Sequence, residues 1–199
     1  MKKQITILLL MVSVVTVTLA QPAVTLLTFG GYTFDESFST EFGKAKVKGG
    51  FQWGGGFEFG VDDYMAIELI YMRQDADVIY NQLITQYTGK AGLNYIMLGG
   101  TRYQPLNDMI SGFGTLDLGA MWTEPSSQLQ TESVTKFAIG GRLGIRITAT
   151  EKVSLRLHAQ LLSPVQWGGL YFGTGGVGVS TGSSILQFNL GGSVNIRLK

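Results

Sequence analysis

Several stretches of the chain alternate between apolar and polar residues with a period of two. Between residues 137 and 147, Ile139, Leu143 and Ile145 occupy odd positions, whereas Arg142 and Arg146 occupy even ones. The stretches 153–161 and 186–198 alternate in the same way. Because successive side chains of a strand point to opposite faces, this pattern indicates strands with one apolar face.

The same pattern, followed along the whole chain, predicts eight strands of about 9 to 14 residues. Strands in soluble sheets usually have about 5–6 residues, whereas a tilted strand that crosses a bilayer needs about 9–11. After the first 20 residues, no apolar run is long enough for a membrane-spanning helix. The expected strands are residues 23–34, 49–60, 64–72, 90–103, 109–122, 137–147, 153–161 and 186–198.

The expected connections alternate between short and long. The short ones are residues 61–63, 104–108 and 148–152, and the long ones are residues 35–48, 73–89, 123–133 and 163–184. Short turns on one side and long loops on the other are typical of outer-membrane barrels, whose long loops face outward. The sequence therefore predicts an all-β fold, an eight-stranded antiparallel up-and-down transmembrane β-barrel with both termini in the periplasm.

The first 20 residues have the pattern of an export signal. Lys2 and Lys3 precede an apolar stretch at residues 5–20, and the small residues Thr18 and Ala20 precede Gln21. This stretch is shorter than the roughly 20 residues of a spanning helix, which argues against a membrane anchor. We therefore expect a cleavable signal peptide at residues 1–20 and a barrel at residues 21–199.

Composition narrows the class of protein further. The 199 residues include 28 Gly and no Cys, and only 15% are charged, with a formal net charge of +1. The absence of Cys excludes disulfides and thiolate metal sites, and the small net charge gives no sign of nucleic-acid binding. Gly doublets inside strands permit strong curvature. We expect no cofactor, no metal and no nucleic-acid partner.

Three segments resemble a known family. Residues 140–161 (GGRLGIRITATEKVSLRLHAQL) resemble the penultimate hairpin of the OmpA/OmpX-like bacterial outer-membrane β-barrel superfamily, and residues 94–105 and 111–122 are similar to its central hairpin. The family usually ends in an aromatic residue, whereas this chain ends Arg197-Leu198-Lys199. The resemblance implies a small eight-stranded barrel in a bacterial outer membrane.

Charged residues within the expected strands should face the lumen. Arg or Lys on the lipid face near the membrane midplane would cost about 2–4 kcal/mol. Acids on the second and third strands would lie opposite bases on the sixth and seventh, so we expect cross-lumen ion pairs that plug the interior. A narrow channel that favours anions is the alternative. The expected lumen set is Glu58, Glu68, Arg102, Asp117, Arg142, Arg146, Arg156, His158 and Arg197.

Aromatic residues should mark the two edges of the membrane, because their rings prefer the headgroup level. We expect one belt near the outer rim and another near the periplasmic rim. The outer belt comprises Phe51, Trp53, Tyr71 and Trp122, and the periplasmic belt comprises Phe59 and Tyr103.

Two other classes of protein are considered, a lipid hydrolase and a secreted barrel. His158, the only histidine of the chain, bears on the first. A lipid hydrolase would need a Ser or an acid within reach of His158, but alternation turns this residue inward, and Gln160 stands where eight-stranded lipid A deacylases carry a Ser. A secreted barrel of the lipocalin type would instead have an apolar interior. We expect no catalytic residue.

The long connections carry whatever is specific to this protein. Polar and aromatic loops on a rigid barrel suit contacts with surface partners, and they also suit plain solvated caps. We expect a monomer that contacts outer-membrane lipid and is not an enzyme. Its role would be membrane integrity or surface interaction and adhesion, with residues 35–48, 73–89, 123–133 and 163–184 as candidate contact segments.

Overall fold

The computed structural model describes residues 23–40, 43–82, 85–125, 133–165, 170–173, 176–179 and 186–198. The signal peptide expected at residues 1–20 lies outside these ranges. No helix in the part of the chain that the structure describes is long and apolar enough to cross a membrane.

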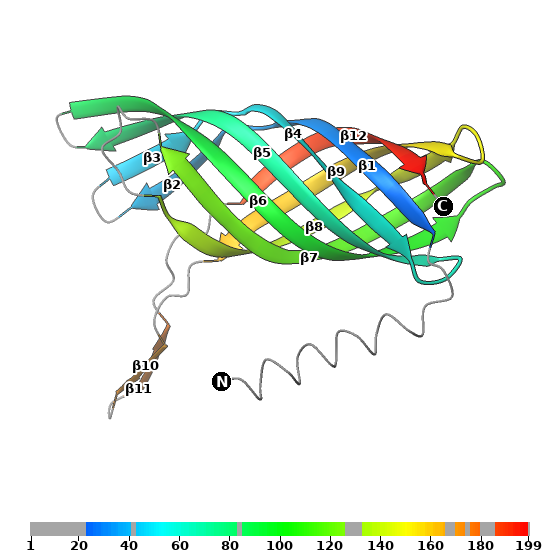
Figure 1. Ribbon diagram of the computed structural model, residues 1–199. Helices are drawn as coiled ribbons and strands as arrows, with labels where there is room; N and C mark the ends of the chain where they lie inside the picture. Colours follow the sequence, from blue (N-terminus) through cyan, green and yellow to red (C-terminus); the bar gives the residue numbers. More distant parts are fainter. Residues whose placement is uncertain are drawn as a thin grey trace, which may run out of the picture.

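The predicted eight-stranded antiparallel barrel is confirmed (Figure 1). Neighbouring barrel strands pair in chain order, and β1 pairs with both β4 and β12, which closes the ring. Closure removes sheet edges, which a bilayer would not tolerate. The barrel strands are β1 (Val24–Thr33), β4 (Gly50–Gly60), β5 (Met65–Gln82), β6 (Thr85–Pro105), β7 (Ile110–Pro125), β8 (Thr135–Thr148), β9 (Val153–Val165) and β12 (Gln187–Arg197).

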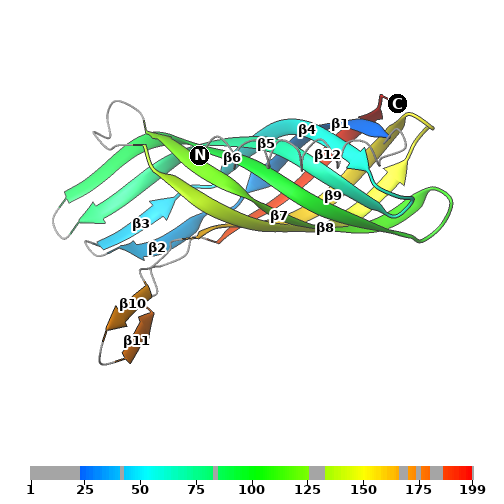
Figure 2. The same cartoon turned by 60° about the horizontal axis from the view of Figure 1, so that its bottom comes forward.

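The two ends of the barrel differ in the length of their connections. The start of β1, the end of β12 and three short turns lie at one end, which we call the periplasmic end (Figure 1). Each turn is held by backbone hydrogen bonds such as those from Val61 to Met65 and from Ala149 to Val153. At the opposite, extracellular end, β5 and β6 project beyond the other barrel strands (Figures 1 and 2).

The prediction of a loop at residues 73–89 is wrong, because β5 and β6 remain paired almost to the tip of their hairpin. Their register runs from Met65 opposite Arg102 to Gln82 opposite Thr85. Asp75 and Asp77 look like loop residues in the sequence, but they lie on a paired strand, where Asp75 is exposed and Asp77 half-buried. Paired backbone groups need no particular side chain, so the hairpin continues past the apolar segment.

The expected loop at residues 35–48 also contains strands. β2 (Glu36–Thr40) and β3 (Gly43–Val47) form a hairpin, and β3 pairs with β5 beyond the point where β4 ends. Strands β2, β3, β5 and β6 thus form a sheet at the extracellular end, which we call the extracellular extension (Figure 2). Within the expected loop 163–184, β10 (Leu170–Gly173) and β11 (Gly176–Val179) pair with each other; residues 126–132 of the loop 123–133 lie outside the described ranges.

The outer wall of the barrel is apolar. Leu116 and Leu143 point outward and are 78% and 71% exposed, and Leu98, Leu118 and Leu157 lie on the same surface. An exposed apolar surface of this extent would be costly in water and is favourable against lipid. The wall therefore fits a membrane environment.

The lumen has two layers of different chemistry. Charged side chains fill the half nearer the periplasm, where Glu68 and Arg142 are buried. Apolar side chains such as Met72, Tyr95 and Met97 fill the extracellular half. They lie among buried amide side chains, including those of Gln52, Gln74, Gln160 and Asn189. The buried charged side chains among the described residues therefore lie in one half of the lumen.

Candidate functional site

The structure brings two acids from adjacent strands together inside the barrel. Glu58 on β4 and Glu68 on β5 are directly opposite each other in the register. Two carboxylates in this position repel each other unless a cation lies between them. Arg156 of β9 supplies it from across the lumen, because its guanidinium donates to Glu58 and, at 2.9 Å, to Glu68.

A second arginine extends this cluster. Arg142 of β8 donates to Glu68 at 2.8 Å and to both carboxylate oxygens of Asp117, at 2.9 and 3.1 Å. Asp117 is on β7, next to β8, so Arg142 connects one wall of the barrel to the other. Arg142 and Arg156 are each only 3% exposed. Buried charges of this kind are stable only when paired and hydrogen-bonded, as these are.

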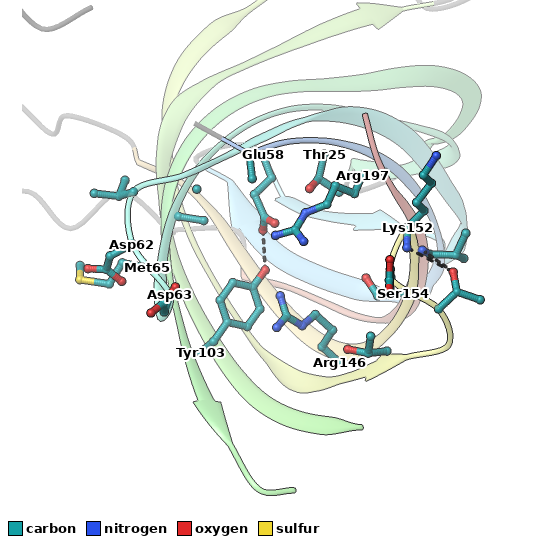
Figure 3. A pocket seen from close by; sticks show the side chains of 18 residues that line it. Thr25, Glu58, Asp62, Asp63, Met65, Tyr103, Arg146, Lys152, Ser154 and Arg197 are labelled. Atoms are coloured by element: carbon teal, nitrogen blue, oxygen red, sulfur yellow. Dashed lines mark hydrogen bonds between the residues drawn. The ribbon is translucent and has the colours of Figure 1, made fainter. Parts of the chain in front are cut away.

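Hydroxyl groups complete the hydrogen bonding of the acids. Tyr103 donates to Glu58, and Thr101 donates to Glu68 while it contacts the hydroxyl of Thr115 at 2.8 Å. We call Glu58, Glu68, Tyr103, Asp117, Arg142 and Arg156 the lumen network. Figure 3 shows the hydroxyl of Tyr103 directed at Glu58 inside the barrel.

Two assignments from the sequence are wrong. Tyr103, expected in the periplasmic aromatic belt, is buried in the lumen network, and Arg102, expected in the lumen, is exposed on the outer wall. The strand β6 carries apolar residues on both faces near this point, with Met97 inward and Ile96 and Leu98 outward. Apolar alternation therefore gives no cue to the orientation of β6.

Register supplies the missing information. Glu68 pairs with Gly99, so even positions on β5 share a face with odd positions on β6. Odd-numbered residues face outward on β4 and β5, whereas even-numbered residues face outward on β6. A sequence signal exists only in the exact length of the β5–β6 connection, where the polar residues 73–89 predict a loop and the structure has paired strands.

Three other expected lumen residues lie beside the network. His158 is buried and stacks on Phe29 with ring centroids 5.2 Å apart, and neither ring nitrogen has a hydrogen-bond partner among the described residues. His158 therefore makes aromatic contacts in place of the expected network bonds. Arg146 is half-buried and Arg197 exposed, both at the periplasmic end; neither takes part in an ion pair of the described chain.

The other expected belt residues face outward. Phe51 and Trp53 are exposed near the extracellular end, and Phe59 is exposed near the periplasmic end. Tyr71 and Trp122 lie against each other on the outer wall, with ring centroids 6.1 Å apart.

A charged cluster that the sequence pattern did not predict lies above this outer belt. Arg73 binds Glu124 at 2.7 Å and Asp75 at 2.9 Å, and the hydroxyl of Tyr71 donates to the buried Asn94 at 2.7 Å. The pKa of the Glu124 carboxyl is held below its ordinary value, first by the hydrogen bond from Arg73. This cluster joins β5, β6 and β7 where the barrel continues into the extracellular extension.

The described part of the lumen holds one histidine, His158, and its surroundings bear on metal binding and catalysis. Within the described ranges, no group of three or more His, Asp or Glu side chains could hold a metal ion. The described rings nearest His158 are those of Phe29 and Phe113, which supply neither a nucleophile nor an acid. What the lumen network does is join opposite walls of the barrel.

A closed ring of eight strands, an apolar outer wall and a charged, side-chain-filled lumen define a class of protein. The chain has the fold of a small eight-stranded outer-membrane β-barrel, and its outer wall fits that location.

Comparisons with known proteins agree with this fold. The chain is similar to Neisserial surface protein A (NspA), with a TM-score of 0.60 and 14% identity over 88% of this chain and 96% of that one. It is also similar to the outer membrane protein OprG from Pseudomonas aeruginosa, with a TM-score of 0.56 and 13% identity over 89% and 97% of the two chains. No protein-family model and no curated protein sequence matches the chain.

Proposed function

We propose that this protein is a non-enzymatic outer-membrane barrel that does not conduct and that acts at its extracellular end. The observation that carries the first part is the lumen network, in which Arg142 and Arg156 connect acids on three strands. The interior of an eight-stranded barrel is only wide enough for side chains. Paired arginines and acids therefore occupy the space that a pore would need.

The second part is supported by the extracellular extension. Strands β5 and β6 have 18 and 21 residues, well beyond the 9–11 or so that cross a bilayer. The hairpin of β2 and β3 widens this sheet through its pairing with β5. A rigid, paired sheet above the membrane suits surface interaction or adhesion better than an unstructured loop, because fewer residues need to be ordered on binding.

Planar-bilayer recordings test the closed lumen. The folded protein is expected to show no stable conductance, because each acid of the lumen network is paired. Removal of a plug side chain by Arg142→Ala is expected to produce current fluctuations, whereas Arg102→Ala on the outer wall is expected to produce none. A stable conductance of the wild type that changes on Arg142→Ala would contradict the plug and support a narrow pore.

A shortened hairpin tests the extracellular role. Ala76 and Ala91 are paired in the register, so residues 77–90 can be replaced by an Asn-Gly turn without a change in the barrel. Cells that carry this variant are compared with wild-type cells for adhesion to immobilised extracellular-matrix proteins and for sensitivity to detergent. Lower adhesion alone supports surface interaction, and higher detergent sensitivity alone supports membrane integrity. If neither changes, the proposed role of the extension is wrong.

A further inference from the structure

A cavity of about 380 Å³ lies between the lumen network and the periplasmic end. Tyr103 and Glu58 form its inner boundary, and Arg146, Lys152 and Arg197 line its sides (Figure 3). Sites for small ligands usually have volumes of about 300–1,000 Å³. The periplasmic cavity is therefore large enough for a small solute or a lipid headgroup.

Two guanidinium groups in this cavity, those of Arg146 and Arg197, form no ion pair with any described residue. Arg146 lies over the ring of Tyr103, with 4.0 Å from its guanidinium carbon to the ring centroid, and its Nε is buried without a hydrogen-bond partner. Arg197 comes from β12, and Figure 3 shows both guanidinium groups directed into the cavity. A buried charged donor without an acceptor, such as Nε of Arg146, destabilises the protein unless a ligand supplies the acceptor. The cavity thus presents charged donors without their acceptors.

The acids around the cavity are already engaged or lie at its rim. Glu58 accepts from Arg156 and from Tyr103. Asp62 accepts a hydrogen bond from the backbone amide of Tyr64 at 2.7 Å. Figure 3 shows Asp62 and Asp63 on the turn after β4, away from the two guanidinium groups.

The remaining charges lie on the turn between β8 and β9. Glu151 and Lys152 are adjacent and exposed there. Water and salt screen charges at the rim far more than charges inside the barrel. The inner side of the cavity therefore carries an excess of positive charge.

We propose that the periplasmic cavity binds a phosphate group, held between Arg146 and Arg197. A guanidinium fork binds one edge of an oxyanion through two parallel hydrogen bonds. Two forks from different strands can occupy two edges of a phosphate, whereas a carboxylate offers only one. The group comes either from a free solute of the periplasm or from a phospholipid headgroup of the inner leaflet.

Titration with inorganic phosphate tests the site. The full-length mature protein, folded in dodecyl maltoside, is titrated at low ionic strength, and binding is measured by isothermal titration calorimetry. Saturable binding is expected. Arg146→Gln and Arg197→Gln are each expected to weaken it about tenfold or more, because each removes charge-assisted hydrogen bonds. Arg102→Gln removes the same charge from the outer wall and is the matched control, with no expected effect.

Two results would overturn the proposal. One is the absence of saturable phosphate binding in the millimolar range, and the other is an equal loss with Arg102→Gln, which would indicate diffuse attraction. Heat-modifiable gel mobility shows whether each variant is folded. If Arg146→Gln does not fold, Arg197→Gln, at an exposed position, decides the test.

A repeat in vesicles distinguishes the two sources of the phosphate group. Vesicles of phosphatidylcholine, whose headgroup carries phosphate but no net charge, are compared with vesicles of neutral galactolipid, which lacks phosphate. Weaker binding of inorganic phosphate in the phosphatidylcholine vesicles alone identifies the headgroup as the occupant. Equal binding in both identifies a free solute.

Discussion

At the scale of single residues, the lumen network depends on the space that a glycine leaves. Gly99 on β6 faces Asp117 of β7 in the register, and a Cβ at Gly99 would overlap the carboxylate of Asp117 and approach Thr115. The next residue, Gly100, faces outward, and a Cβ there would meet nothing within 4 Å. These neighbouring glycines thus differ in a way that can be tested.

We expect Gly99→Ala to lower the free energy of unfolding by about 1–3 kcal/mol, because the added methyl displaces Asp117 from Arg142. Gly100→Ala should change it by no more than about 0.5 kcal/mol. Urea unfolding in lipid vesicles, followed by gel mobility, measures both variants. Equal effects of the two substitutions would show that backbone flexibility and not the space beside Asp117 sets the requirement for glycine.

At the scale of elements, one ion pair joins the barrel to the extracellular extension. Lys46 of β3 lies 2.7 Å from Asp35, which follows β1, and Asp35 also accepts the amide of Gly49 at 2.8 Å. The pKa of Asp35 is held below its ordinary value of 3.8, first by the hydrogen bond from Lys46 and next by that from Gly49. The ionised carboxylate therefore stabilises the β1–β3 connection.

This contribution should depend on pH in one direction. A carboxylate with a lowered pKa stabilises the folded state above its ordinary pKa, and the effect is lost as the pH falls through the lowered value. The protection factor of the Gly49 amide, which corrects for the intrinsic pH dependence of exchange, should therefore stay high at pH 5 and fall at pH values below 3.8. Hydrogen–deuterium exchange measures this, with Asp35→Asn as the control. A similar fall of the protection factor in Asp35→Asn would contradict the role of the carboxylate.

At the scale of the whole molecule, the aromatic residues of the outer wall set the depth of the barrel in the bilayer. Trp53 is 46% exposed, and Trp122 lies against Tyr71 just below the charged cluster around Arg73. Indole rings prefer the headgroup level. The barrel should therefore place both tryptophans at one interface, below the extracellular extension.

Fluorescence quenching tests this depth. In a Trp167→Phe background, Trp53 and Trp122 are the remaining tryptophans of the chain. Lipids brominated near the headgroup should quench their emission more strongly than lipids brominated at the end of the acyl chain. Stronger quenching by the deep bromines, or none by either lipid, would show that the barrel does not lie in the bilayer as its apolar wall indicates.

The sequence by itself determined the architecture of this protein. Period-two alternation, such as that of Leu143 and Ile145 against Arg142 and Arg146, predicted the barrel strands and their number. Alternation is reliable where one face is lipid and the other is charged, because the two environments select opposite residue types.

Only the tertiary structure decided which residues meet. The orientation of β6, and with it the exchange of Tyr103 for Arg102 in the lumen, follows from the β5–β6 register, since both faces of β6 are apolar there. The extracellular extension depends on backbone pairing, which polar side chains neither favour nor exclude. Depth in the lumen decides which arginines are paired. Arg142 and Arg156 reach the acids of the lumen network, whereas Arg146 and Arg197 line the periplasmic cavity. This depth is set by the tilt and stagger of the strands, which the sequence of a single strand does not show.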